Sequence, residues 1–242
     1  MKSLYEEKFR LRVADFDRYD RITPSALLDL SQDVAGKHAA DFNVGYEDFK
    51  KNDCIWVLLR TRYEFITNPK QHSYVNVKTW PRKRGRVDFD RDTLILDEFD
   101  NIVCKMQSKW AIVDSVKRTL VLPRNYNYPF GDCLDESTFD TPFEKLENFD
   151  VSSLKGVDIK TEYSDVDHNG HINNVSYVKF ALNLMKLEEK YYISNLEINY
   201  VHELKENEPL ILYMKKENNE YNFKAVSDDK VIFLLKINVK EK

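Results

Sequence analysis

The sequence predicts an α+β protein made of two similar units, each an antiparallel sheet wrapped around one long central helix. Three observations predict this fold class. Each half of the chain has a strand and a polar junction before an apolar helix, several β-rich segments follow each helix, and residues at the two junctions match at a fixed offset. Such a repeated order of elements is the sequence sign of an internal duplication.

The composition is that of a chain able to build hydrophobic cores. Of its 242 residues, 42% are hydrophobic and 32% charged, which argues against disorder. The formal net charge is −4, so nucleic acid is not an expected partner. No membrane span is expected, because the longest apolar run, residues 55–59, is too short, and the N-terminus lacks an apolar signal region.

The first half reads as a strand, a helix and several long strands. Residues 8–13 alternate between polar and apolar, which predicts a strand. Thr23 followed by Pro24 indicates a helix start with Thr as N-cap, and the helix should run to residue 40. This helix is apolar over most of its surface, so it should be wrapped by other elements, with His38 packed inside. Further strands are predicted at 55–66, 73–81, 87–97 and 102–114.

The acidic stretch 131–150 is predicted to connect an N-terminal domain, residues 1–130, to a C-terminal domain, residues 151–242. The element order then restarts with a strand at 157–163. A helix should follow from about Asn174 to Lys190. The remaining strands are predicted at 195–202, 209–216, 221–227 and 230–239.

The two halves align at an offset of 150 residues. The matched pairs are Asp15 with Asp165, Asp17 with Asp167, Ile22 with Ile172, and Thr23 with Asn173. A strand, a long apolar helix and then antiparallel strands is the outline of a hotdog unit. Two tandem hotdog units in one chain are therefore expected, which would imitate a hotdog dimer.

The densest polar stretch of the chain runs from Asp165 to Tyr177 and continues into the second predicted helix. If this segment is extended, Asp167, Asn169 and His171 leave the same face. An acid, an amide and an imidazole on one side can hold, polarise and deprotonate a substrate. The alternative is a polar Asx turn that does no more than precede the helix.

The start of this helix supplies two candidate substrate-binding residues. Asn173 or Asn174 can act as the N-cap, and free N–H groups in the first turn would place a partial positive charge nearby. Structural interpretations compete with the functional ones. Asp165 is expected to be structural, Asn173 to be a cap, and Tyr177 to belong to the core.

The three cysteines, Cys54, Cys104 and Cys133, are widely separated and have no Cys or His neighbour at zinc spacing. They are expected to be reduced thiols, buried rather than reactive, as in a cytoplasmic protein. Neither a metal nor a cofactor is predicted.

The polar stretch resembles a motif of the acyl-acyl carrier protein thioesterases of bacteria and plant plastids. That motif runs Asp-x-Asp-x-Asn-x-His-x-Asn-Asn-x-x-Tyr, and every fixed position is present from Asp165 to Tyr177. A later family signature, Glu-Tyr-Arg-Arg-Glu-Cys, corresponds to residues 199–204. Tyr200 and Glu203 match there, but the basic pair is absent and Leu204 replaces the Cys.

The first half resembles the family more weakly. The similar segments, which extend the resemblance to about residues 4–240, are Ile55–Arg60, Thr79 with Trp80, and Gly85 with Arg91 and Asp92.

The resemblance implies hydrolysis of the thioester between a fatty acyl chain and the phosphopantetheine arm of acyl carrier protein. Carried over by residue, the catalytic set would be Asp167, Asn169, His171 and Glu203. Because Leu204 replaces the family Cys, water is the economical nucleophile, with Glu203 as general base. A direct nucleophilic role for the carboxylate stays open. His171 would position the water or bind the carbonyl, and Asn169 would donate to the thioester oxygen.

The first half has Tyr19 and Arg21 where the second has Asn169 and His171. It is therefore expected to be catalytically silent and to help form the acyl-chain tunnel.

A local basic run consists of Arg82, Lys83, Arg84 and Arg86. This run is either a solvated hairpin end or a docking contact for the acidic surface of acyl carrier protein.

Other functions remain compatible with the sequence. They are an acyl-CoA thioesterase with the same chemistry, a non-catalytic acyl-binding hotdog protein, and a hotdog hydratase. The expected partner is acyl carrier protein bearing a fatty acyl chain. The chain itself would be a monomer, as a pseudo-dimer of hotdogs, or a homodimer.

Overall fold

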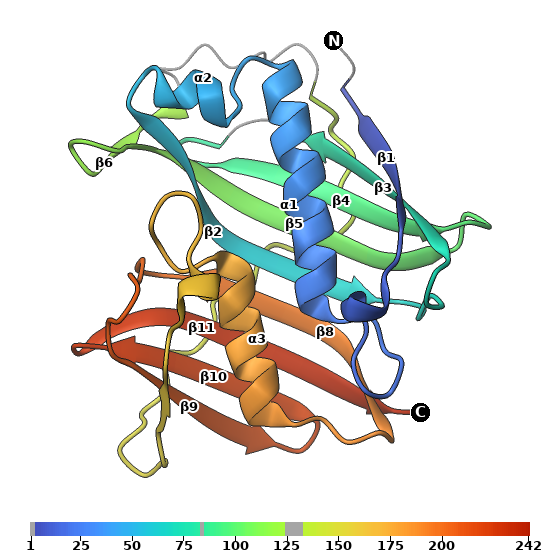
Figure 1. The fold of residues 1–242 in the computed structure, drawn as a ribbon, viewed down its shortest axis with the longest axis vertical. Coiled ribbons are helices and arrows are strands. Elements are labelled where there is room, and N and C mark those ends of the chain that lie inside the picture. The colour runs from blue at the N-terminus through green and yellow to red at the C-terminus, as the bar shows by residue number, and fades with distance from the viewer. Residues whose placement is uncertain (1–2, 83–84, 124–132) are drawn as a thin grey trace. The chain divides into compact units, whose positions relative to one another are not determined.

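The computed structural model describes residues 3–82, 85–123 and 133–242. The chain folds into two compact units, Met1–Pro142 and Phe143–Lys242. Both units consist mainly of antiparallel strands and carry few helices, which fits a hotdog-like fold (Figure 1).

Unit 1, Met1–Pro142, has an antiparallel sheet in the order β1-β3-β4-β5-β2, with the short strand β6 paired to β5. The register is regular between β1 and β3, from Tyr5 opposite Thr79 to Arg10 opposite Tyr74. The strands are β1 (Tyr5–Arg10), β2 (Cys54–Phe65), β3 (Tyr74–Pro81), β4 (Phe89–Asp97), β5 (Ile102–Asp114) and β6 (Thr119–Val121).

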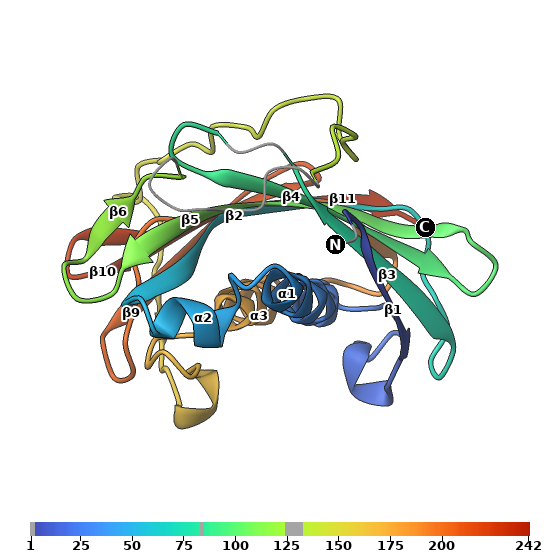
Figure 2. The same cartoon turned by 90° about the horizontal axis from the view of Figure 1, so that it is seen from above.

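Helix α1 (Pro24–Asp41) lies on the concave face of the unit 1 sheet (Figure 2). The predicted start is confirmed, because the Thr23 hydroxyl accepts the N–H of Ala26 at 3.2 Å and Pro24 occupies the first turn. The predicted packing of His38 is also confirmed. Its ring is 2% exposed and its Nδ1 lies 3.2 Å from Arg91 Nη1.

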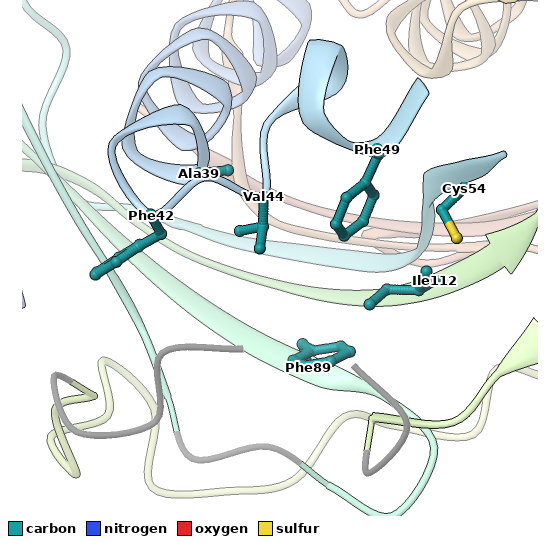
Figure 3. Packing of buried hydrophobic residues seen from close by; sticks show 7 residues of the cluster. All are labelled: Ala39, Phe42, Val44, Phe49, Cys54, Phe89 and Ile112. Carbon is teal, nitrogen blue, oxygen red and sulfur yellow. The ribbon is translucent and has the colours of Figure 1, made fainter. Parts of the chain in front are cut away.

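The sequence did not predict strand β6 or the short helix α2 (Tyr46–Lys50). Helix α2 places Phe49 against the end of the sheet, where its ring stacks on Trp56 at 5.0 Å. Figure 3 shows the resulting cluster of buried side chains, Ala39, Phe42, Val44, Phe49, Cys54, Phe89 and Ile112. A five-residue helix is too short for periodicity to reveal it.

The N-terminal strand lies earlier in the chain than predicted. It covers Tyr5–Arg10 instead of residues 8–13. The chain then bends into a 3₁₀ turn, Val13–Asp15, in which the Asp15 carboxylate accepts the N–H of Arg12 at 2.7 Å. This side-chain bond competes with strand pairing. The strand therefore ends at Arg10, although the alternation of polar and apolar residues continues to Val13.

Residues 133–142, from the predicted connector, form an ordered strap on unit 1. Arg91 of β4 contacts α1, whereas its neighbour Asp92 accepts the N–H of Thr138 at 2.7 Å. Successive side chains of a strand point to opposite faces, so the strap covers the face opposite α1 (Figure 2). The Arg62 guanidinium donates to the carbonyl oxygens of Thr141 at 2.5 Å and Pro142 at 2.9 Å.

Unit 2, Phe143–Lys242, has an antiparallel sheet in the order β8-β11-β10-β9-β7. Its helix α3 (Asn174–Met185) packs on this sheet and contacts β9. The strands are β7 (Val157–Ile159), β8 (Tyr191–Tyr200), β9 (Leu210–Glu217), β10 (Glu220–Ser227) and β11 (Lys230–Glu241).

Several boundaries in unit 2 differ from the prediction, and strand β8 begins at Tyr191, four residues before the predicted start. Helix α3 ends at Met185 and not at Lys190, because Lys186 adopts a left-handed conformation at φ 48° and caps the helix. Strand β7 ends at Ile159, and Tyr163–Asp165 forms a 3₁₀ turn instead of extending the strand.

The remaining connector residues belong to unit 2. Leu146 and Phe149 are buried there, and the Phe149 carbonyl accepts a hydrogen bond from Lys224 Nζ at 3.1 Å. Lys236 also pairs with Glu144. Within the described parts of the chain, no helix combines the length and the apolar character that a membrane crossing requires.

Candidate functional site

The polar motif folds as a tight loop built around an Asx turn at Asp167. Asp167 Oδ1 accepts the N–H of Asn169 at 2.8 Å and that of His171 at 3.4 Å. The N–H of Asp167 donates to the carbonyl of His171 at 2.8 Å. Gly170 provides the left-handed residue of the turn at φ 77°. The prediction of an extended segment with three side chains on one face is therefore wrong, because the chain reverses between them.

Asn173 is the N-cap of α3, as the structural interpretation predicted. Its side-chain oxygen accepts the N–H of Val175 at 2.9 Å, and its carbonyl accepts that of Ser176 at 2.9 Å. Those two N–H groups are therefore already bonded, which corrects the expectation that they would be free for a substrate. The carbonyl of Asn174, in the first turn, accepts the Tyr200 hydroxyl at 3.4 Å.

The same loop occurs in unit 1, 150 residues earlier. Asp17 Oδ1 accepts the N–H of Tyr19 at 2.8 Å and that of Arg21 at 3.1 Å. The N–H of Asp17 donates to the carbonyl of Arg21 at 2.9 Å. Asp17 and Asp167 thus share one backbone task, which identifies Asp167 as a residue that shapes the loop.

The residues before each loop match as well. Asp15 accepts the N–H of Arg12, and Asp165 accepts that of Glu162 at 3.0 Å, so both carboxylates close a 3₁₀ turn. Phe16 with Ile22 and Val166 with Ile172 form equivalent β-bridges. The predicted structural role of Asp165 is confirmed by this geometry.

The structure brings Glu203 to His171. The distance from His171 Nε2 to Glu203 Oε2 is 3.5 Å, and the two side chains are 18% and 30% exposed. They are therefore partly desolvated yet open to a ligand. Ile172 follows His171 in the chain, and Leu204 follows Glu203. These two following residues are joined by a backbone hydrogen bond, in which the N–H of Ile172 donates to the Leu204 carbonyl at 2.8 Å.

Leu204 is the residue whose role the sequence did not reveal. Its side chain is fully buried, at 0% exposure, so it fixes the end of the Glu203 segment in the core. Burial raises the pKa of the neighbouring Tyr177 phenol, and a hydrogen bond from the Leu204 backbone offsets part of that increase. In the sequence, Leu204 is the one apolar residue between His202 and Glu206, and this could have indicated that its side chain is buried.

Unit 1 closes its loop differently. The N–H of Ile22 donates to Asn68 Oδ1 at 2.8 Å, where Ile172 bonds a backbone carbonyl. Arg21 replaces His171 and forms an ion pair with Asp17 Oδ2 at 2.7 Å. In unit 1 the loop therefore contacts the Asn68 amide and contains the Arg21–Asp17 ion pair. In unit 2 the corresponding groups are the Glu203 carboxylate and the His171 imidazole.

Three of the four predicted catalytic residues lie on the unit 2 loop, and Glu203 is brought to it. Asn169 is exposed, and its Nδ2 lies 3.4 Å from Asp167 Oδ2. An exposed amide and an imidazole thus lie on one hydrogen-bonded loop, and a carboxylate lies on the segment that pairs with it. This set can polarise a carbonyl, position water and accept a proton.

The basic run is less uniform than predicted. Arg82 Nη1 lies 3.7 Å from Asp92 Oδ2, and the N–H of Arg82 donates to the Asp90 carbonyl at 2.8 Å. Arg82 therefore serves the internal structure of unit 1, while Arg86 is exposed. Lys83 and Arg84 lie outside the described residues.

The cysteines all belong to unit 1, and none is near the motif in sequence. Cys54 and Cys104 are buried, which raises the pKa of both thiols and makes them poor nucleophiles. Within the described ranges, no group of three or more His, Cys, Asp or Glu side chains could hold a metal ion.

Comparison with known families gives two adjacent matches. Residues 2–123 match the acyl-ACP thioesterase N-terminal domain, and residues 150–240 match the acyl-ACP thioesterase C-terminal domain.

Curated relatives carry related descriptions. The chain is 26% identical over 207 residues to an oleoyl-acyl carrier protein thioesterase of Coriandrum sativum, which covers 77% of this chain and 55% of the relative. A second such thioesterase, from Arabidopsis thaliana, is 26% identical over 198 residues, or 74% of this chain and 54% of the relative. The chain thus spans about half the length of these relatives.

Two solved structures show the same fold. An acyl-ACP thioesterase from Bacteroides thetaiotaomicron superposes with a TM-score of 0.88 at 22% identity, covering 98% of both chains. The 12:0-ACP thioesterase from Umbellularia californica superposes with a TM-score of 0.89 at 18% identity, covering 100% of this chain and 99% of the other.

The shared loop gives a matched pair of predictions. Asp17→Ala and Asp167→Ala each remove the acceptor of two backbone N–H groups, so each should lower the free energy of unfolding by about 1–3 kcal/mol. Urea denaturation measures this loss, and Asp140→Ala, at an exposed position, is the control. Full stability of both loop variants would contradict the assignment of these carboxylates to the backbone of the loops.

Proposed function

The chain belongs to the acyl-ACP thioesterase family, and we propose on this basis that it hydrolyses fatty acyl thioesters of acyl carrier protein. The products would be a free fatty acid and the carrier with a free thiol, which ends chain elongation. The observation that carries the proposal is the 3.5 Å contact between Glu203 and His171, on the loop that also carries Asn169. The competing functions, namely acyl-CoA hydrolysis, acyl binding without turnover and hydration, are outcomes of the tests below.

In the proposed mechanism, Glu203 removes a proton from water while the water oxygen attacks the thioester carbonyl carbon. His171 holds this water or the carbonyl, and the Asn169 amide N–H stabilises the negative charge that develops on the oxygen. One such donor is worth roughly 3–4 kcal/mol in the transition state. The C–S bond then breaks, and the phosphopantetheine thiolate leaves and takes up a proton. Direct attack by the Glu203 carboxylate is the alternative first step.

Asp167 acts in this scheme through the residues it holds. Its carboxylate bonds the backbone N–H groups of both Asn169 and His171, so it keeps an oxyanion donor and an imidazole in register. Asn173 caps α3 and the Asn174 carbonyl accepts the Tyr200 hydroxyl, and both residues remain candidates for contact with the substrate.

The finer architecture is also part of the proposal. Each unit would be one hotdog, with α1 and α3 as the central helices, and residues 131–150 would connect an acyl-binding domain, 1–130, to a catalytic domain, 151–242. The repeated loops and the burial of both helices support this division. Unit 1 would be catalytically silent, because Arg21 stands in place of the His171 imidazole and Asn68 in place of the segment that carries Glu203.

The proposed partner is acyl carrier protein, with Arg86 and its neighbours in the basic run as a docking contact for its acidic surface. Arg82 is left out of the proposed contact, because its guanidinium pairs with Asp92. A cytoplasmic location is proposed from the three free cysteines. Either a monomer or a homodimer is compatible with the proposed mechanism.

The carrier preference is directly testable. With matched acyl groups, kcat/KM should be clearly higher for acyl carrier protein thioesters than for CoA thioesters, as measured by thiol release. Neutralising Lys83, Arg84 and Arg86 while keeping Arg82 should lower kcat/KM for the protein carrier, and the loss should shrink at high salt.

The control neutralises three cations on unit 2, Lys155, Lys240 and Lys242, and should leave kcat/KM unchanged. Equal or better turnover of the CoA thioester would overturn the choice of carrier. Turnover of an enoyl thioester without thiol release would indicate a hydratase, and acyl binding without any turnover would indicate a binding protein.

The general base gives a second prediction. Glu203→Gln keeps the shape of the side chain and removes its basicity, so kcat should fall by roughly 10²–10⁴. Glu206→Gln, an exposed carboxylate of the following loop, is the matched control and should retain activity. Thiol alkylation should also leave turnover intact in folded protein. Near-normal activity of Glu203→Gln, together with inactivation by alkylation, would replace the carboxylate mechanism with a cysteine mechanism.

A further inference from the structure

Two tyrosines of unit 2 lie beneath the segment Val201–Leu204, which carries Glu203. Tyr177 is on α3 and 3% exposed, and Tyr200 is the last residue of β8. Their ring centroids are 6.0 Å apart, and the Tyr177 ring also lies 5.2 Å from that of Phe233. The proposed mechanism uses neither phenol.

The first half of the segment is attached to the start of strand β11. The N–H groups of Val201 and His202 both donate to the Ile232 carbonyl, at 2.8 and 3.2 Å. His202 Nδ1 lies 2.7 Å from the Val231 carbonyl. The two residues that precede Glu203 are thus held by strand β11.

The phenols attach the segment to α3 at both of its ends. Before the segment, the Tyr200 hydroxyl donates to the Asn174 carbonyl at 3.4 Å. After it, the Leu204 backbone lies close enough to the Tyr177 hydroxyl to lower its pKa, and the Leu204 carbonyl accepts the N–H of Ile172 at 2.8 Å. Glu203 therefore lies between two tethers to the helix that begins at the end of the His171 loop.

We propose that Tyr177 and Tyr200 are positioning residues that hold Glu203 at its working distance from His171. The inference rests on the proposed function, because it assigns these tyrosines to the same reaction. Burying a hydroxyl in an apolar core carries a cost that phenylalanine would avoid. In this proposal the rings of both tyrosines fill the core, and their hydroxyls hold the Glu203 segment against the helix that follows the His171 loop.

The test uses Tyr177→Phe and Tyr200→Phe, which keep the rings and remove one oxygen each. Each should lower kcat about tenfold with little change in KM, because substrate binding is retained while the catalytic pair loosens. Tyr221→Phe is the control. Tyr221 is buried in β10 of the same unit, and Lys216 Nζ lies over its ring, 4.8 Å from the centroid.

Amide hydrogen exchange provides a readout that needs no activity. In Tyr177→Phe, exchange at Ile172 should accelerate, because its acceptor, the Leu204 carbonyl, is no longer held in place. Exchange in the centre of β11 should stay as in the wild type, which shows that the fold is intact. Tyr221→Phe should leave the exchange of Ile172 unchanged.

Unchanged kcat and unchanged exchange at Ile172 in folded Tyr177→Phe would overturn the inference. A fall in kcat that accompanies equal acceleration of exchange throughout β11 would also overturn it, since the role would then be general stability. A wild-type protein without thiol release would refute the proposed function instead. In that case the exchange at Ile172 still decides whether Tyr177 holds the segment.

Discussion

The backbone hydrogen bond from Ile172 to Leu204 is the interaction on which the site depends. It joins a loop before α3 to the segment after β8, which are distant in sequence. His171 and Glu203 each precede one of the bonded residues, so the contact between their side chains follows from it. Leu204 can serve as this anchor because its side chain is wholly buried, and the position that carries Cys in the family signature is here a structural one.

The two units show how one loop can be used for two purposes. Asp17 and Asp167 hold the same backbone turn, and both loops lead into the first turn of a capped helix. The differences lie in the side chains that the turn presents. Arg21 is neutralised by its own loop, whereas His171 reaches a carboxylate from another segment. The scaffold is therefore retained in unit 1, whereas the proposed mechanism uses only residues of unit 2.

Local patterns predicted most of the elements and failed where tertiary contacts decide. Thr23 with Pro24 and the β-rich runs located α1 and the long strands, because caps and alternation act over a few residues. Helix α2 and the end of α3 were missed, since one depends on the packing of Phe49 and the other on the left-handed Lys186.

The sequence named candidate site residues, but it did not predict the geometry in which they lie. The motif pointed to Asn169, His171 and Glu203, yet spacing in an extended chain could not show that Asp167 folds the loop back on itself. The ion pair of Arg82 with Asp92 was hidden for a similar reason, because its partner lies on a different strand. Contacts between distant segments are what a single sequence leaves open.

The most direct test of this account compares His171→Ala with Arg21→Ala, its counterpart in unit 1, in thiol release from an acyl carrier protein thioester. Loss of the imidazole should reduce kcat by roughly 10²–10⁴ in folded protein. Loss of the guanidinium should leave kcat within a few-fold of the wild type, even if some stability is lost. An equal collapse of activity in folded Arg21→Ala would contradict the assignment of the chemistry to unit 2.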